Sequence, residues 1–380
     1  MLVGTGDIRD RRPGTASDGS RLRLPALATA LALGVALLTG CGGTKRATPT
    51  GTPAPAGLLL AVVAEAQETS QVQLFDPASG AARRTVASVA HRNGWGITAS
   101  VSPNGRQLAY VVLPRDAIDP DTQGELWLLS LTSPSSRRLA TGVDLRSELV
   151  WSPDSAWVSY VKVTAPSIDL RRVNASGAGD QSLAVAGPTD RWFLFGYTAD
   201  GRNVELAHLT GAGTAFDSAE PGTKPQAEQP ISSGSARGFV VSPAGRPALL
   251  ALQDENGRQV YRALAQRQDG SFARLTQDGI EDTGIAWNPR SGEATVGVVP
   301  AAPGQPVPAA PGAHAIVPAS GFDVPVAWSP DGALLALRHF SGASTDDPGT
   351  ETIAVLSGSR RVELRSAEPL TIAGWAASRG

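Results

Sequence analysis

A short motif recurs along the chain and constrains the fold more than any other feature of the sequence. In its fullest form, Trp328-Ser329-Pro330-Asp331-Gly332, each residue type suits one position of a tight turn. Ser favours the first position, Pro has the φ angle that the second requires, Asp favours the third, and Gly tolerates the positive φ that follows. Apolar segments at 324–328 and 333–337 flank the turn. The motif therefore predicts two antiparallel strands joined by a hairpin with a Gly bulge.

Related segments recur at nearly regular intervals. Each begins with an apolar or aromatic residue that is followed by a turn-forming sequence, and the seven copies start at Val101, Trp151, Tyr197, Val241, Trp287, Trp328 and Trp375. The spacing of roughly 41 to 50 residues is that of a four-stranded blade. The sequence therefore predicts an all-β fold, a seven-bladed β-propeller.

The two ends of the repeat region predict how the ring is closed. Residues 58–63 resemble the strand that follows a turn, but no turn precedes them. Residues 370–375 resemble the strand before a turn, but no strand follows. Pairing these N-terminal and C-terminal strands completes one blade and removes an exposed sheet edge. We expect the pairing to close the propeller.

One repeat departs from the pattern. After the apolar strand at 294–299 the chain continues through 300–312, which is rich in Pro and Ala, where a third strand is expected. Pro cannot donate a hydrogen bond to a central ladder. The sequence therefore predicts a long loop here and a smaller outer edge for the sixth blade.

The first part of the chain has the features of an export signal. Several Arg residues precede an apolar run at 24–38, which is shorter than a membrane-spanning helix requires. The run ends in Leu38-Thr39-Gly40-Cys41, which resembles the lipobox of bacterial lipoproteins. This resemblance implies cleavage after residue 40 and a lipid on the Cys41 thiol. In the alternative interpretation, Cys41 is a buried thiol at the end of an uncleaved anchor.

The chain is accordingly divided into three parts. Residues 1–40 are expected to be a lipoprotein signal peptide, residues 41–56 the lipid anchor with a flexible tether, and residues 57–380 the propeller. Residues 42–56 are rich in Thr, Pro, Gly and Ala and cannot form an apolar face. The expected location is the extracytoplasmic face of the cell membrane, with the membrane itself as a partner through the Cys41 lipid.

The repeats also resemble those of a known family. The turn sequence beginning at Trp328, and the Leu108-Ala109-Tyr110 strand that follows its second-blade copy, are similar to the propeller repeats of TolB proteins. Together with the lipobox they look like the propeller half of actinobacterial lipoproteins of the LpqB type, over about residues 57–380. The resemblance implies a protein partner or cell-envelope ligand and a role accessory to membrane signalling.

Composition and motifs limit the chemistry that the chain is expected to perform. The net charge of −2 gives no reason to expect a nucleic-acid partner, and Cys41 is the only cysteine, which excludes disulfides within the chain. The sequence contains neither a Gly-x-Ser-x-Gly elbow nor a Walker phosphate loop. We therefore expect no catalytic residues and no cofactor, and leave the binding residues unassigned.

An enzymatic alternative needs a metal ion in the central funnel of the propeller, as in a hydrolase or lactonase. The best candidates for metal ligands are four carboxylates in one loop, which could offer oxygens to Ca²⁺: Asp116, Asp119, Asp121 and Glu125. A solvated acidic loop is the competing interpretation. The preferred function is a lipid-anchored binding scaffold at the cell envelope.

The charged residues predict an electrostatic difference between the two faces of the disc. Acidic residues such as Glu68, Asp254 and Asp346 occur in loops of one class, whereas Arg83 and Arg360 lie near turns of the other class. In a propeller these two classes lie on opposite faces. The hypothesis is a field that orients the disc over an anionic membrane or steers a partner; the alternative is ordinary solubilising charge.

Overall fold

A computed structural model describes residues 59–118, 123–133, 135–187, 191–210, 213–222, 231, 235–277, 281–302 and 304–377. Every regular element in these ranges is a β-strand. Within them there is also no helix of the length and apolar character needed to cross a membrane. The predicted signal peptide, Cys41 and the tether lie outside the described residues, so their predictions remain expectations.

The strands form six hydrogen-bonded sheets. The first contains strands from both ends of the chain in the order β26-β1-β2-β3, with bounds Leu370–Ala376, Leu59–Glu65, Thr69–Phe75 and Ala82–Ala90. The second has eight strands: β4 (Thr98–Val101), β5 (Gln107–Val112), β6 (Gly124–Ser130), β7 (Ser136–Val143), β8 (Val150–Trp151), β9 (Trp157–Thr164), β10 (Ser167–Asn174) and β11 (Gln181–Ala186). This sheet holds two of the predicted repeats, joined through the single residue pair Val143 and Lys162.

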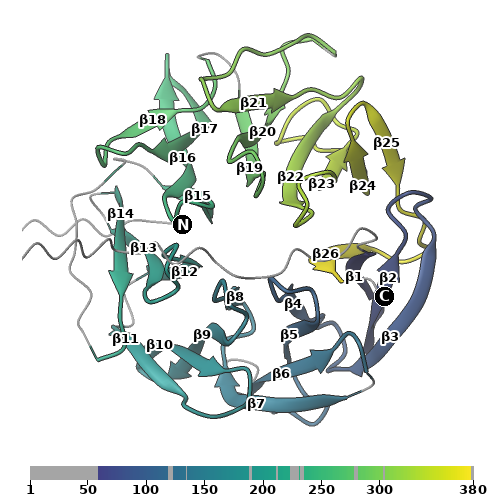
Figure 1. The fold of residues 1–380 in the computed structure, drawn as a ribbon, viewed down its shortest axis with the longest axis vertical. Helices are drawn as coiled ribbons and strands as arrows, with labels where there is room; N and C mark the ends of the chain where they lie inside the picture. Colours follow the sequence, from purple (N-terminus) through teal and green to yellow (C-terminus); the bar gives the residue numbers. More distant parts are fainter. Residues whose placement is uncertain are drawn as a thin grey trace, which may run out of the picture. The chain divides into compact units, whose positions relative to one another are not determined.

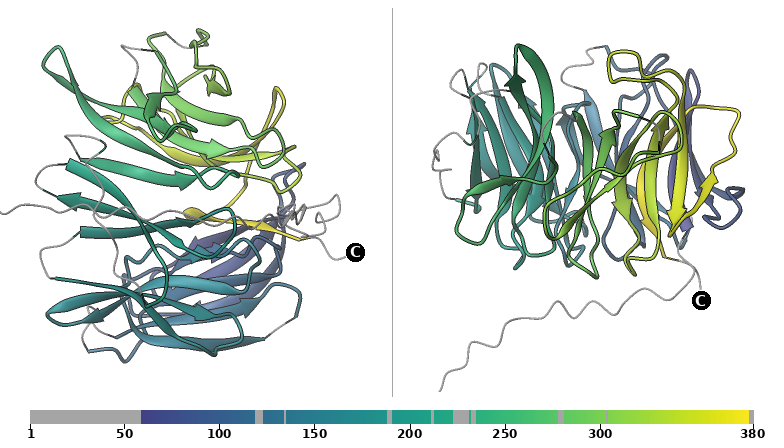
Figure 2. Two further views of the ribbon diagram at one scale, coloured as in Figure 1. Left: turned by 60° about the vertical axis from the view of Figure 1, so that its left-hand side comes forward. Right: turned by 90° about the horizontal axis from the view of Figure 1, so that it is seen from above.

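The other four sheets each hold one repeat. They contain β12 (Arg191–Tyr197), β13 (Val204–Thr210) and β14 (Gly213–Ala219); β15 (Ala236–Val241), β16 (Pro247–Glu255), β17 (Arg258–Gln266) and β18 (Phe272–Arg274); β19 (Glu281–Trp287), β20 (Ala294–Val299) and β21 (Ala313–Ile316); and β22 (Phe322–Trp328), β23 (Leu335–Phe340), β24 (Glu351–Ser357) and β25 (Arg360–Glu363). Within residues 59–377 the sheets stand around a common centre, with β4, β8, β12, β15, β19, β22 and β26 innermost (Figure 1). The strands run across the thickness of this ring (Figure 2).

The recurrent turns have the predicted geometry. Gly332 has a φ of 69° and donates its N–H to the carbonyl of Ser329 at 2.8 Å. The Ser329 hydroxyl is fully buried, donates to Asp331 and accepts the N–H of Leu334 at 2.9 Å. The turn therefore satisfies its own polar groups. In the second copy, which begins at Trp151, Ser155 replaces the glycine and holds the same left-handed conformation, at φ 63°.

The predicted pairing of the end strands is present. Strands β1 and β26 are antiparallel, with Leu60 opposite Trp375 and Ala64 opposite Leu370. The backbone N–H of Ala377 then donates to the carbonyl of Gly105 in the next sheet, at 2.8 Å. The two ends of the described chain are thus held in one sheet and fastened to its neighbour.

The repeat with the Pro-rich insertion differs as predicted and in one further respect. Residues 300–312 form no strand where the structure describes them, and the sheet has three strands. The third strand, β21, runs parallel to β20, with Ala294 opposite Ala313. A long connection is what a parallel pair requires, because the chain must return to the same end of the sheet before it pairs.

The core lies between neighbouring sheets. Clusters of buried Leu, Val and Ala side chains contain residues from two adjacent sheets, for example Leu108 of β5 with Val72 of β2. Tryptophans at the ends of inner strands add polar links, because the indole N–H of Trp151 donates to the carbonyl of Ser100 at 3.0 Å and that of Trp375 to Ala327 at 3.1 Å. Trp151 and Trp375 therefore link the inner strands of neighbouring repeats.

Candidate functional site

A hollow of about 640 Å³ lies at the centre of the ring, which we call the central hollow. Its wall comes from β15, β16, β19, β22 and β23, together with the loop before β8 and the loop after β23. The loop residues Glu148, Thr345 and Pro348 lie on the face opposite the recurrent turns, so the hollow reaches that face. The wall residues that carry the following argument are Glu148, Arg237, Phe239, Ile285, Val324 and Arg338.

Arg237 is the exposed cation of the central hollow. It lies near the start of β15, and its guanidinium carbon stacks over the ring of Tyr261 at 3.6 Å from the centroid. Stacking fixes the plane of the guanidinium but leaves its N–H donors available. Within the described residues Arg237 makes no ion pair, so these donors can bind a carboxylate from outside the chain.

Glu148 brings a carboxyl group to the same hollow. Its side chain is reached by solvent, yet it is surrounded by protein on the channel wall, and this desolvation raises its pKa. Desolvation penalises the charged form of a carboxyl group. A ligand that donates a hydrogen bond or brings a positive charge would stabilise the carboxylate.

Arg338 separates the central hollow from a second one. It forms a two-pronged ion pair with Glu351, at 2.6 and 2.8 Å, and its guanidinium also lies 5.0 Å from the ring centroid of Phe340. The hydrogen bonds to Glu351 raise the pKa of Arg338 above its ordinary value. Because both ends of the pair are satisfied, Arg338 shapes the wall and is a weaker candidate than Arg237 for ligand recognition.

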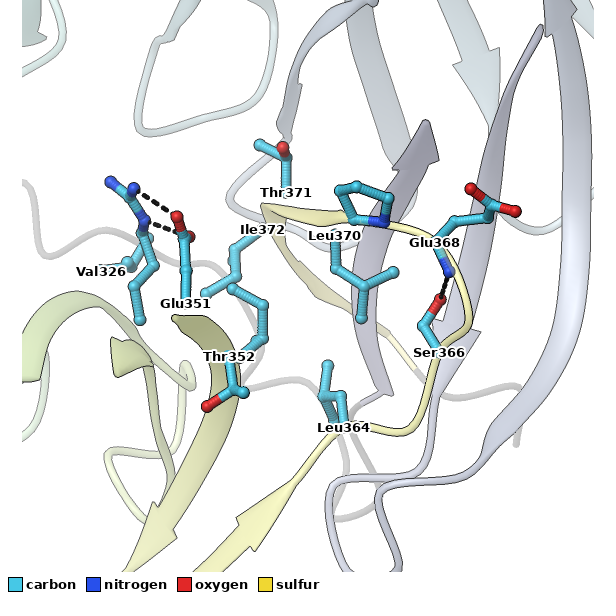
Figure 3. A pocket seen from close by; sticks show the side chains of 12 residues that line it. Val326, Glu351, Thr352, Leu364, Ser366, Glu368, Leu370, Thr371 and Ile372 are labelled. Carbon is cyan, nitrogen blue, oxygen red and sulfur yellow. Dashed lines mark hydrogen bonds and ion pairs between the residues drawn. The ribbon is translucent and has the colours of Figure 1, made fainter. Parts of the chain in front are cut away.

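The second hollow, which we call the interblade hollow, has a volume of about 510 Å³ and shares Val326 and Arg338 with the central one. It lies between β24 and the segment at 364–372 that leads into β26 (Figure 3). Leu364, Leu370 and Ile372 form its apolar wall, and Glu368 stands at its edge (Figure 3). The two hollows are therefore neighbours that share part of one wall.

Aromatic side chains extend the apolar wall of the central hollow. Phe239 of β15 lies 5.9 Å from Phe193 of β12, measured between ring centroids, and 5.7 Å from Phe195. Phe193 and Val326 are both more than a third exposed. Large apolar groups that stay accessible beside an exposed guanidinium are the usual lining of a ligand site.

The structure describes two of the four predicted metal ligands, Asp116 and Glu125. Glu125 accepts hydrogen bonds from Arg138 at 2.6 Å and from the indole N–H of Trp127 at 2.8 Å, one on each carboxylate oxygen. Asp116 is exposed, and Asp119 and Asp121 lie outside the described residues. Across the described ranges no cluster of three His, Cys, Asp or Glu residues is suited to a metal ion. The four-carboxylate prediction stays untested as a set.

The histidines make separate contacts. His91 accepts a hydrogen bond from Ser70 at Nε2, at 3.0 Å, if its Nδ1 donates to the carbonyl of Arg92, also at 3.0 Å. A hydroxyl bonded to an imidazole resembles part of a nucleophilic site. Both side chains are fully buried, so this pair holds the first sheet together and offers no surface to a substrate.

Sequence reasoning did not find Arg237, Glu148 or Phe239. They lie on different repeats and become neighbours only through the ring, so no local motif joins them. A usable signal existed in β15, where Arg237 is the second residue of a strand that also contains Phe239 and two valines. A charged residue at the first end of an inner strand is a candidate for the channel wall.

Comparison with solved structures identifies the architecture. TolB from Acinetobacter baumannii aligns with a TM-score of 0.50 and 15% identity over 84% of this chain and 66% of that one. The β-propeller domain of the Trilobed protease from Pyrococcus furiosus, described as having an open velcro topology, aligns with a TM-score of 0.51 and 10% identity over 82% of this chain and 96% of that one. The fold is that of a β-propeller.

Larger enzymes contain a similar propeller. Acylaminoacyl peptidase from Pyrococcus horikoshii aligns with a TM-score of 0.54 and 10% identity over 81% of this chain and 50% of that one. The chain thus spans about two thirds of the length of the TolB structure and about half of the peptidase. No protein-family model matches the sequence, and no curated protein matches it either. At these identities the likeness concerns the fold alone.

Proposed function

We propose that this protein is an exported, lipid-anchored, seven-bladed propeller that binds an extended segment of a protein partner in its central hollow. The observation that carries the proposal is the exposed guanidinium of Arg237, held by Tyr261 at the edge of an accessible aromatic wall in a recess of about 640 Å³. Sites for small ligands and peptide side chains have this size and this mixture of apolar surface with a few polar groups.

Seven blades are supported by the repeats and by the strand pairing. Strands β4–β7 and β8–β11 share a sheet only through one residue pair, so they are best counted as two blades. With the five other sheets this gives seven. The antiparallel pairing of β1 with β26 supports a closed ring.

Lipid anchoring rests on the sequence. The Arg-rich start, the apolar run at 24–38 and Cys41 directly after small residues form a lipoprotein signal pattern. Intact-mass analysis of the membrane-extracted protein tests it. We expect a chain that begins at Cys41 and carries a diacylglycerol mass, and an unmodified Cys41 in an uncleaved chain would refute the anchor.

The chemistry of the hollow indicates the ligand. Arg237 offers paired N–H donors that match a carboxylate, Glu148 accepts an N–H from a backbone or a basic group, and Phe239 and Val326 contact apolar side chains. A peptide segment with an acidic residue beside an apolar one presents all three. The ligand class is therefore an extended acidic and apolar peptide.

Selection of displayed random peptides on the immobilised full-length protein tests the proposal. We expect enrichment of peptides that combine an acidic residue with an aromatic or aliphatic one. Loss of a charge-assisted pair of hydrogen bonds is worth about 1.5–3 kcal/mol, so Arg237→Ala should weaken the selected peptides by roughly 10- to 100-fold. Arg267→Ala, an exposed arginine on the opposite face, is the matched control. Equal binding to the wild type and to Arg237→Ala would refute the site.

A further inference from the structure

One face of the propeller is formed by its tight turns, and we call it the turn face. It holds the recurrent turns at 102–105, 152–155, 198–201, 242–245, 288–292 and 329–332. The connections between third and fourth strands, such as 76–81, 267–271 and 358–359, lie on the same face because the strands of each sheet alternate in direction. The central hollow opens on the other face.

Several pairs of neighbouring turns contact one another along a rim around the centre. The N–H of Asn104 donates to the hydroxyl of Ser155 at 3.1 Å, and the amide of Asn288 donates to the carbonyl of Gly332 at 3.0 Å. The Cβ position of Gly245 lies 2.6 Å from the backbone nitrogen of Ala199 in the turn before it. These contacts hold the turn residues in fixed places relative to one another.

Four of the turns carry an arginine, which directly follows the positive-φ glycine in three of them and precedes it by two residues in the fourth: Arg106, Arg202, Arg246 and Arg290. Arg106, Arg202 and Arg290 are exposed, and Arg246 is half-buried. Within the described residues their only ion pair is the long contact of 3.7 Å between Arg202 and Asp200. The rim therefore presents a ring of guanidinium groups whose donors are available.

The carboxylates of the same turns are engaged locally. Asp154, Asp200 and Asp331 each accept a hydrogen bond from the Ser or Thr hydroxyl of their own turn, at 2.5, 2.6 and 2.5 Å. These bonds lower the pKa of Asp200 and Asp331, so these two carboxylates remain ionised. The negative charge of these aspartates lies close to the backbone of the turn. Arginine has a longer side chain, so its positive charge lies further out from the rim.

The outer part of the turn face adds further cations. A shallow hollow of about 760 Å³ lies between residues 78–81 and 360–365, and Arg360, Arg361 and Arg365 line it together with Glu363. Arg361 pairs with the buried Asp323 at 2.7 Å, while Arg360 and Arg365 are exposed. Two exposed guanidinium groups beside one recess suit a phosphate-bearing headgroup.

The position of the first strand places the proposed anchor on this face. Leu59 pairs with Ala376, the last residue of β26 before the chain reaches the turn face, so the chain preceding Leu59 joins the propeller at that edge. Cys41 lies only roughly 17 residues upstream, and a flexible Gly- and Pro-containing segment of that length spans about 25 Å on average. The opposite face carries Glu68, Asp116, Asp254, Asp346 and Asp347, and three of its exposed arginines, Arg115, Arg146 and Arg258, each form an ion pair with a carboxylate there.

From these observations we infer that the turn face is a membrane-binding surface that contacts anionic phospholipid headgroups through its arginines, with the central hollow directed away from the bilayer. The inference rests on the proposed lipid anchor for its direction. Single lipid chains bind membranes reversibly, and a basic surface is one of the second signals that make anchoring stable. The tether keeps the arginines close to the bilayer. Their attraction to the anionic headgroups acts over one Debye length, about 10 Å.

Co-sedimentation of the full-length protein with lipid vesicles tests the inference. The vesicles contain either phosphatidylcholine alone or phosphatidylcholine with about 30 mol% phosphatidylglycerol. The apolar run at 24–38, or a lipid on Cys41, contributes to binding of both kinds of vesicle. The ratio of the two partition coefficients therefore isolates the electrostatic contribution to binding. We expect a ratio of about ten or more at low salt that falls towards one at high salt.

Two charge-matched variants decide which face of the propeller binds the anionic vesicles. The quadruple variant R106Q/R202Q/R246Q/R290Q removes the turn-face ring, and R115Q/R146Q/R191Q/R258Q removes four exposed arginines from the opposite face. We expect the first to lower the ratio roughly tenfold and the second by less than about threefold. Equal losses in the two variants, or a ratio near one for the wild type, would overturn the inference.

Hydrogen exchange gives a second readout that does not depend on a variant folding. On anionic vesicles, amides of 198–203 and 242–246 should exchange more slowly than on neutral vesicles, while those of 341–350 should not change. Slower exchange only in 341–350 would show the opposite orientation. Failure of the peptide-binding or intact-mass experiments would refute the proposed function without altering the vesicle ratio, so the two outcomes are distinguishable.

Discussion

Replacing Gly105 by Ala is expected to destabilise the propeller by about 1.5–3.5 kcal/mol. Gly105 has a φ of 70°, and an L-residue in this conformation costs about 1–2 kcal/mol. An added Cβ would also lie 2.4 Å from the backbone nitrogen of Ala377, which cannot rotate away as a side chain would. Displacing Ala377 sacrifices its hydrogen bond to the Gly105 carbonyl, a further loss of about 0.5–1.5 kcal/mol.

Gly292 provides a matched control for this prediction. It lies in the corresponding region of another recurrent turn with a φ of 71°, but no atom lies within 4 Å of its Cβ position. Gly292→Ala should therefore cost only the conformational part, about 1–2 kcal/mol. Urea unfolding followed by tryptophan fluorescence measures both variants, with an unchanged m-value as the check that midpoints can be compared. Equal destabilisation by the two substitutions would refute the contact between the last strand and the second sheet.

Three further predictions follow from buried polar groups. Burial raises the pKa of Asp282 to about 6. The contribution of Asp282 to the free energy of unfolding is therefore present at low pH and is lost as the pH rises. In urea unfolding, the wild type should lose about 3 kcal/mol of unfolding free energy relative to Asp282→Asn between pH 4 and 7. Ser329→Ala should destabilise by about 1–2 kcal/mol and raise the pKa of Asp331 towards its ordinary value, because the Ser329 hydroxyl is the main cause of its depression; NMR titration of Asp331 checks it, and an unchanged pKa would contradict it. Arg361→Met should lower stability by about 3–5 kcal/mol in thermal or urea unfolding, because it leaves Asp323 buried without its guanidinium partner; a change below about 1 kcal/mol would show that the pair is not desolvated.

The strands and turns of the fold could be predicted because each repeat carries its own local signals. The turn residues at 329–332 fix a hairpin wherever they occur, and the unpaired segments at 58–63 and 370–375 indicated their mutual pairing. The parallel pairing of β21 with β20 could not be predicted. It depends on where the chain returns to the sheet after the loop at 300–312, whose sequence has no strand or turn motif. The joining of two repeats by Val143 and Lys162 likewise arises from a chance approach of neighbouring sheet edges.

The candidate site could not be predicted for a different reason. Glu148, Arg237 and Arg338 are separated by long stretches of sequence, and the curvature of the ring alone determines which strand ends meet. The acidic loop at 116–125 was conspicuous in the sequence because its residues are neighbours along the chain. Sequence neighbours in a loop need not converge, whereas residues at equivalent positions of successive inner strands must face the same channel.

Photo-crosslinking in intact cells tests most directly whether the central hollow is the binding site. A photoreactive phenylalanine analogue replaces Phe239 in the hollow or, as a control, Val185, which is 68% exposed on the outer strand β11. The account predicts a discrete crosslinked product from position 239 that is lost when Arg237 is also changed to Ala, and none from position 185. No product from position 239, or one that persists without Arg237, would contradict it.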